Sequence, residues 1–83
     1  MKIQLRYFAS LREALGTSEA IEVQAGCSVA QLRDELIARG EPHASALART
    51  RALRTALNQT LCDESIELCD GAELAFFPPV TGG

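Results

Sequence analysis

The residues best placed for chemistry in this 83-residue chain are its last nine, Ala75–Gly83, which read AFFPPVTGG. Pro78 and Pro79 follow directly on an apolar run, and Gly82-Gly83 closes the sequence. Proline fixes a backbone torsion and lacks an N–H donor, so this pair should end a sheet ladder and project an extended segment. Glycine lacks a Cβ and fits channels too narrow for other residues. We therefore expect the terminal carboxylate of Gly83 to enter the active site of another protein.

The segment cannot bind a partner strongly by itself. It spans six residues, 78–83, and ordering six residues costs on the order of 5–10 kcal/mol. The folded body must therefore dock as well, and we predict an apolar patch at the base of the tail formed by Phe8, Leu61 and Phe77. The predicted partner-binding set is completed by Pro78, Pro79, Val80, Thr81 and Gly82. The alternatives are ordinary core packing for the three apolar residues and a frayed chain end for the tail.

The rest of the sequence offers no catalytic constellation. His43 is the one histidine, and we expect it to be solvated on a short surface helix. The carboxylates are scattered, and no glycine-rich stretch resembles a phosphate cradle. Cys27, Cys62 and Cys69 lack CxxC spacing, so we expect small, partly buried side chains and no metal site. Whether the chain should count as an enzyme stays open, because only Gly83 is expected to react.

Composition narrows the classes of partner. With 47% hydrophobic and 23% charged residues the chain should fold, and a net charge of −3 gives no reason to expect nucleic acid. We expect Arg49, Arg51 and Arg54 to form a solvated surface or a local salt-bridge face. No apolar run approaches the ~18–20 residues of a membrane span. The alternating N-terminal sequence is unlike a signal peptide, so we expect a cytoplasmic protein without membrane partners.

Hydrophobic periodicity predicts an α+β roll. Ile3, Leu5 and Tyr7 point one way from a strand over 2–8, and Ser28 with Gln31 forms a capping box that begins the main helix. The other expected elements are a helical turn at 10–15, strands at 20–24, 52–57, 60–61 and 72–77, and a helical piece at 42–48. We expect four to five strands in a mixed sheet on one main helix, with the first and last strands as parallel neighbours. The domain should span 1–77 and a flexible tail 78–83.

Smaller features refine this fold. Gly40 should cap the main helix in a left-handed conformation, since glycine carries no Cβ penalty there. Asn58-Gln59 reads as a turn between two strands. Residues 63–70 read as a loop in which Ile66 and Leu68 act as apolar anchors. We expect these elements to bury one face of the sheet against the main helix.

Three stretches together resemble a known family. They are RYFASLRE (6–13), ALNQTL (56–61) and DGAELAFFPPVTGG (70–83). The whole chain is similar to the small subunit of molybdopterin synthase, a ubiquitin-like β-grasp sulfur carrier. Ala72 departs from the acidic residue common after the Asp-Gly turn, and Arg54 and Thr55 are more polar than usual. Neither departure affects the tail.

The resemblance implies a function. A ubiquitin-activating-type enzyme would use ATP to adenylate Gly83, and a sulfurtransferase would supply sulfur to give a thiocarboxylate. The large synthase subunit would accept the tail in a heterotetramer, and sulfur would pass to cyclic pyranopterin monophosphate to form the molybdopterin dithiolene. The chain itself would bind no cofactor. The alternatives are a sulfur carrier for thiamine biosynthesis, a ubiquitin-like protein modifier, and a docking domain without covalent chemistry.

Overall fold

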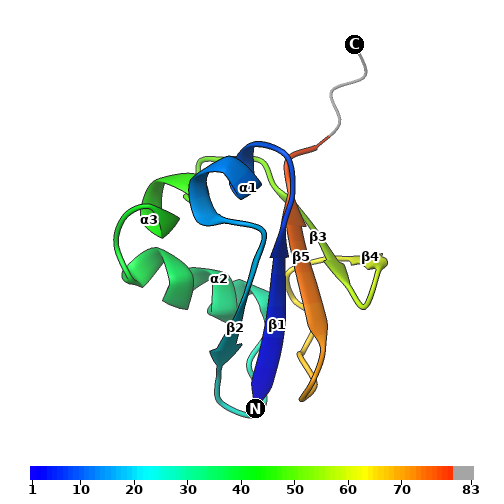
Figure 1. The fold of residues 1–83 in the computed structure, drawn as a ribbon. Helices are drawn as coiled ribbons and strands as arrows, with labels where there is room; N and C mark the ends of the chain where they lie inside the picture. The colour runs from blue at the N-terminus through cyan, green and yellow to red at the C-terminus, as the bar shows by residue number, and fades with distance from the viewer. Residues whose placement is uncertain (80–83) are drawn as a thin grey trace.

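A curved sheet with helices on one side forms the body of the molecule (Figure 1). The computed structural model describes residues 1–79, and Val80, Thr81, Gly82 and Gly83 lie outside the described residues. Within 1–79 the elements are β1 (Lys2–Tyr7), α1 (Ser10–Leu15), β2 (Ser18–Glu22), α2 (Val29–Ala38), α3 (His43–Ala46), β3 (Arg54–Leu57), β4 (Thr60–Cys62) and β5 (Glu73–Phe77). The predicted α+β class and mixed sheet on a main helix are confirmed.

The sheet is mixed because its first and last strands run in the same direction. The strand order is β2-β1-β5-β3-β4, and β1 pairs with β5 in parallel while the other three pairings are antiparallel. Tyr7 lies opposite Phe76 in the register of β1 and β5. The predicted parallel pairing of these strands is therefore confirmed. It places the first and the last strand of the chain side by side within the sheet.

The core lies between the sheet and the helices. Ile3, Leu5 and Tyr7 are buried on the helix side of β1, as their alternation predicted. Leu74 and Phe76 of β5 are fully buried on the same side. Helix α2 contributes Val29, Leu32 and Leu36 to this core. No helix of residues 1–79 covers the opposite face of the sheet, and we call that face the open face.

Local signals in the sequence set the ends of α2. The Ser28 side chain accepts a hydrogen bond from the Gln31 backbone at 3.2 Å, and the Gln31 side chain accepts one from the Ser28 backbone at 2.9 Å. This is the predicted capping box. Gly40 has a φ of +91°, so the predicted left-handed residue after the helix is also confirmed.

Several element boundaries differ from the prediction. Strand β2 spans Ser18–Glu22 rather than 20–24, and β3 begins at Arg54 rather than at 52. Val23 lies beyond the strand, yet its side chain is buried in the core, and its N–H donates to the Met1 carbonyl at 2.9 Å. In the 63–70 loop, Leu68 is a buried anchor as expected, whereas Ile66 is 42% exposed. The prediction for Ile66 was wrong: its backbone carbonyl accepts from the Val29 N–H at 3.0 Å, so Ile66 holds the loop through its main chain while its side chain stays exposed.

Candidate functional site at the base of the tail

Phe8 and Phe77 lie next to each other where β1 and β5 end. The strands are parallel neighbours, so their C-terminal ends lie at the same end of the sheet (Figure 1). The Phe8 N–H donates to the Phe76 carbonyl at 3.3 Å, which extends the pairing by one residue. Phe8 and Phe77 follow the buried residues Tyr7 and Phe76, and side chains alternate between faces along a strand. Both phenylalanines therefore belong to the open face.

Leu61 joins the same face through the strand register. Leu61 pairs with Ala56, Ala56 with Ala75, and Ala75 with Arg6, so one row crosses four strands. Leu61 is 65% exposed and Phe8 is 40% exposed, whereas Phe77 is half-buried. Core packing is thereby excluded for Phe8 and Leu61. The structure brings the three predicted patch residues onto one face, and their binding of a partner stays a prediction.

Arg6 holds the Phe8 side of this patch. Its guanidinium carbon lies 5.5 Å from the centroid of the Phe8 ring, within the range of a cation–π contact. The same guanidinium lies 3.7 Å from the Glu73 carboxylate. The Arg6 charge is therefore balanced within the chain, and its cation–π contact helps to hold the Phe8 ring at the tail base.

A tight turn fixes the position of Phe8. Ala9 has a φ of +54°, which an L-residue with a Cβ adopts only at a cost. The turn is held by hydrogen bonds of 3.1 Å from the Leu11 N–H to the Phe8 carbonyl and from the Arg12 N–H to the Ala9 carbonyl. Sequence reasoning missed Ala9, because nothing in its residue type indicates a positive φ. The turn makes the chain leave β1 directly after Phe8.

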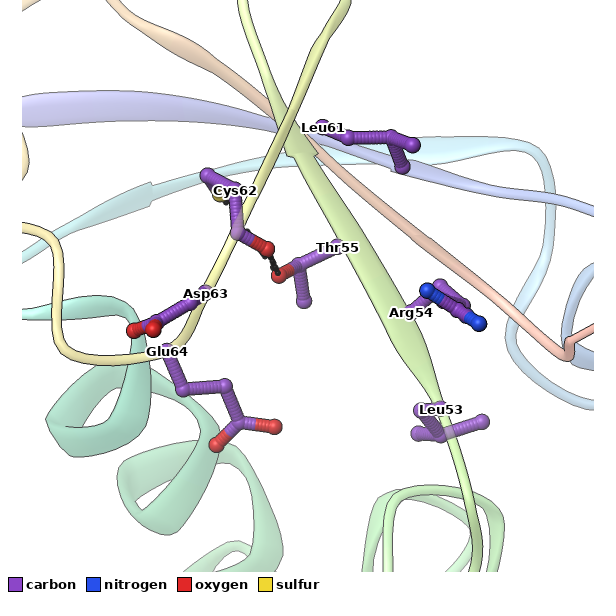
Figure 2. A pocket seen from close by; sticks show the side chains of 7 residues that line it. All are labelled: Leu53, Arg54, Thr55, Leu61, Cys62, Asp63 and Glu64. Carbon is purple, nitrogen blue, oxygen red and sulfur yellow. Dashed lines mark hydrogen bonds between the residues drawn. The ribbon is translucent and has the colours of Figure 1, made fainter.

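A hollow adjoins the open face where β3 and β4 separate (Figure 2). Its volume is about 470 Å³, and its lining residues are Leu53, Arg54, Thr55, Leu61, Cys62, Asp63 and Glu64. The Thr55 hydroxyl donates to the Cys62 carbonyl at 3.0 Å on the helix side of the strands. Arg54 and Leu61 turn the other way, onto the open face (Figure 2). The hollow therefore continues the predicted patch along the edge of the sheet.

The tail itself is only partly described. Pro78 and Pro79 are half-buried and lie in no helix or strand, directly after the end of β5 at Phe77. The predicted roles of Val80, Thr81, Gly82 and Gly83 fall outside the described residues. The structure shows where the tail leaves the domain: directly after Phe77 and beside the exposed ring of Phe8.

His43 is part of a polar cluster rather than a solvated side chain. Its Nε2 lies 3.0 Å from Glu19 Oε2, and Arg39 donates to Glu19 Oε1 at 2.7 Å. The Tyr7 hydroxyl donates to the same carboxylate at 3.2 Å. The prediction for His43 was wrong because α3 packs this side chain over β2, leaving 15% of it exposed.

The cluster shifts the pKa of two groups. Burial and the nearby Glu19 carboxylate raise the pKa of Tyr7 well above its ordinary value, so the phenol stays protonated. Burial by itself would raise the pKa of Glu19, but hydrogen bonds with His43 and Arg39 outweigh it and lower that pKa. Through the Glu19 carboxylate the cluster joins β1, β2, α3 and the end of α2, so its contacts support the fold.

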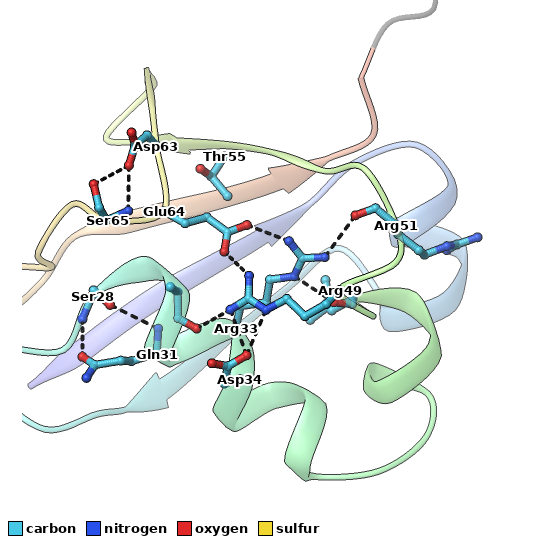
Figure 3. Close-up of polar contacts among 12 residues, drawn as sticks. Ser28, Gln31, Arg33, Asp34, Arg49, Arg51, Thr55, Asp63, Glu64 and Ser65 are labelled. Carbon is cyan, nitrogen blue, oxygen red and sulfur yellow. Dashed lines mark hydrogen bonds and ion pairs between the residues drawn. The ribbon is translucent and has the colours of Figure 1, made fainter.

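A second polar cluster fastens α2 to the loops on either side of β3 and β4 (Figure 3). Arg33 is buried, and it donates to the carbonyls of Leu47 at 2.8 Å and Ala48 at 2.7 Å and to the Glu64 carboxylate at 2.6 Å. Arg49 pairs with Glu64 and with Asp34. The local salt-bridge face predicted for the arginines is thus confirmed for Arg49.

The potential metal ligands of residues 1–79, the cysteines among them, do not gather at one place. Within residues 1–79, no group of three or more His, Cys, Asp or Glu side chains is arranged to hold a metal ion. All three cysteines are free thiols, and they differ in environment: Cys27 is buried, Cys62 half-buried and Cys69 exposed. The expectation of partial burial was therefore wrong for Cys69. A helix capable of crossing a membrane is also absent from these residues.

Comparison with known proteins places this geometry in a family. The ThiS family profile matches residues 5–83. The molybdopterin synthase sulfur carrier subunit of Escherichia coli is 45% identical over 82 residues, which cover 98% of this chain and 99% of the relative. The subunit of the same name from Haemophilus influenzae is 38% identical with the same coverage. The similarity therefore extends from end to end and includes the tail.

Solved structures agree on the fold. A putative molybdopterin converting factor subunit 1 from Pyrococcus furiosus superposes with a TM-score of 0.80 at 28% identity, covering 96% of this chain and 99% of that one. A complex of subunits 1 and 2 of the molybdopterin-converting factor from Helicobacter pylori contains a chain with a TM-score of 0.69 at 24% identity, covering 100% of both chains. The ubiquitin-like β-grasp fold is therefore confirmed.

Proposed function

Because this chain belongs to the ThiS family, we propose that it is the sulfur carrier subunit of a molybdopterin synthase. The observation that carries the proposal is the end-to-end match to carriers of that name, at up to 45% identity. The structure adds a physical reason. Phe8, Leu61 and Phe77 share the open face beside the point where the tail leaves β5.

The proposed chemistry takes place at Gly83. A carboxylate is a poor electrophile, so one of its oxygens first attacks the α-phosphorus of ATP on an activating enzyme and releases pyrophosphate. A sulfur nucleophile at the oxidation level of sulfide, delivered by a sulfurtransferase, then attacks the acyl carbon and expels AMP. The product is a thiocarboxylate. ATP belongs to the activating enzyme, and this chain binds no cofactor in the proposal.

The large synthase subunit would then receive the tail. The thiocarboxylate sulfur attacks a side-chain carbon of cyclic pyranopterin monophosphate, so that a carbon–sulfur bond replaces a carbon–oxygen bond and the oxygen leaves as water or as the opened end of the cyclic phosphate. Water then cleaves the acyl–sulfur bond, which leaves the sulfur on the pterin and restores the Gly83 carboxylate. Two such transfers complete the dithiolene of molybdopterin. In this proposal the active site lies on the large subunit, and this chain contributes the Gly83 thiocarboxylate to it.

The body of the domain provides the binding free energy that the tail lacks. Phe8 and Leu61 expose apolar surface at the tail base, and such surface stabilises a complex when a partner removes it from water. Prolines at 78 and 79 restrict the unbound tail and so reduce the entropy lost on ordering it. In the proposal, the docked domain and the restricted tail together position Gly83 in the active site of the large subunit.

Reconstitution with purified components tests the proposal. We expect the thiocarboxylated chain and a molybdopterin synthase large subunit to convert cyclic pyranopterin monophosphate to molybdopterin, and the unmodified chain to give none. A parallel reaction with thiazole synthase tests the thiamine alternative. Product in that reaction alone would overturn the proposal. A protein modifier would instead appear as higher-mass conjugates of the chain on lysines of other proteins, and a docking domain would tolerate one added C-terminal residue.

A further inference from the structure

Arg54 places a positive charge on the open face. It is exposed, and it makes no ion pair with any residue in 1–79. The other arginine of the same face, Arg6, is balanced by Glu73 at 3.7 Å. The carboxylates nearest in the adjoining hollow are engaged elsewhere, since Asp63 accepts from Ser65 and Glu64 pairs with Arg33 and Arg49.

The position of Arg54 puts it inside any interface formed at the tail base. It lies directly opposite Phe77 in the register of β3 and β5, and Phe77 is the last residue before Pro78. It also lies beside Leu61 along the rim of the hollow (Figure 2). A partner that covers Phe77 and Leu61 therefore reaches Arg54 as well. Covering an unpaired charge is strongly unfavourable unless the partner supplies an opposite one.

We propose that Arg54 is a specificity-determining residue that pairs with a carboxylate of the large synthase subunit beside that subunit's own apolar patch. The guanidinium presents a planar fork of N–H donors, which matches the two oxygens of an Asp or Glu side chain. The apolar contacts of Phe8, Leu61 and Phe77 give affinity, and Arg54 selects a partner whose carboxylate lies in register. This inference rests on the proposed function, because it takes the large subunit as the partner.

Calorimetric binding of the intact chain to the large subunit tests the inference. We expect Arg54→Glu to weaken binding by about tenfold or more and Arg54→Gln by about threefold to tenfold, with both losses smaller at high salt. Lys2→Glu is the matched control, since it makes the same charge change at the far end of β1. It should alter the dissociation constant less than about twofold. Melting temperatures confirm that all variants are folded.

Each result has one meaning. If both Arg54 variants bind within twofold of the wild type, or if Lys2→Glu weakens binding as much as Arg54→Glu, the role of Arg54 is overturned while the carrier function stands. If the wild-type chain itself does not bind the large subunit, the proposed function fails and the inference fails with it.

Discussion

The rings of Tyr7 and Phe76 stack in the core with their centroids 6.4 Å apart and their planes 19° apart. Each ring belongs to one of the two parallel strands, and each is followed by a phenylalanine on the opposite face. The core contact therefore fixes where Phe8 and Phe77 emerge. The position of the tail base is in this way determined by packing inside the domain rather than by the tail.

The exposed rings at the tail base should matter for binding more than for folding. We expect Phe8→Ala to weaken binding to the large synthase subunit by about tenfold or more, because aromatic residues at the centre of an interface dominate its affinity. Phe77→Ala should weaken it similarly, with a larger loss of stability because Phe77 is half-buried. Calorimetry and thermal unfolding would measure the two effects.

Ile66→Ala provides the control for Phe8→Ala. Ile66 is exposed to a similar degree, 42% against 40%, but its carbonyl accepts from the Val29 N–H at the start of α2, away from the open face. Binding by Ile66→Ala should match the wild type. If Phe8→Ala and Phe77→Ala also bind as tightly as the wild type, the predicted patch is wrong.

The terminal glycines should contribute to function and not to stability. Deleting Gly82 and Gly83 should leave the melting temperature nearly unchanged, since glycines bury little apolar area, while sulfur transfer is lost. Adding one residue after Gly83 should likewise abolish transfer, because the activatable terminal glycine is gone. A large drop in melting temperature on deletion would show instead that the tail packs on its own domain.

Arg33 should be the polar residue on which stability depends most. Its side chain is 4% exposed and satisfies the carbonyls of Leu47 and Ala48 as well as Glu64. Arg33→Met would leave the buried Leu47 carbonyl without a donor and would remove one of the two ion pairs of Glu64, so we expect the free energy of unfolding to fall by about 2–4 kcal/mol. Urea unfolding measures it, with Arg12→Met on the exposed face of α1 as control. Equal effects of the two substitutions would contradict this role.

Acid should weaken the fold through Glu64. Burial by itself would raise the pKa of Glu64, but hydrogen bonds from Arg49 and Arg33 lower it below the ordinary value of 4.5. A carboxylate with a lowered folded-state pKa stabilises fully above its unfolded pKa, and that contribution is lost as the pH falls through the folded value. The stability difference between wild type and Glu64→Gln should therefore shrink as the pH falls below about 4.5.

Urea unfolding at several pH values would measure this difference. Glu13→Gln, on the exposed surface of α1, is the matched control and should show no comparable dependence. A difference between wild type and Glu64→Gln that is the same at about pH 6 as at about pH 3 would contradict the role of the ion pairs.

The sequence predicts most of the fold because its signals are local. Alternation in β1 and the Ser28–Gln31 capping box depend on neighbouring residues, and both are confirmed. The parallel pairing of the first and last strands is also confirmed. It could be predicted because a chain with one main helix has few other ways to bury both strands. Strand ends such as that of β2 were less accurate, since they depend on pairing partners rather than on residue type.

The polar clusters could not be predicted in the same way. His43 and Glu19 are 24 residues apart in sequence, and Arg33 and Glu64 are 31 apart, so their contacts exist only once the domain has packed. The candidate site could be predicted in part. Alternation placed Phe8 opposite the core, and Leu61 joined it only through the register of four strands. Ala9 gave no signal because its positive φ arises from the turn.

The central claim is that Gly83 carries sulfur, and the intact mass of the chain tests it most directly. The protein would be purified from its own cells and weighed before and after incubation with ATP, a sulfur source and the activating enzyme. We expect the mass gain that corresponds to replacing one oxygen by sulfur, located on Gly83 by fragmentation. An unchanged mass, under conditions that convert a known carrier, would contradict the account.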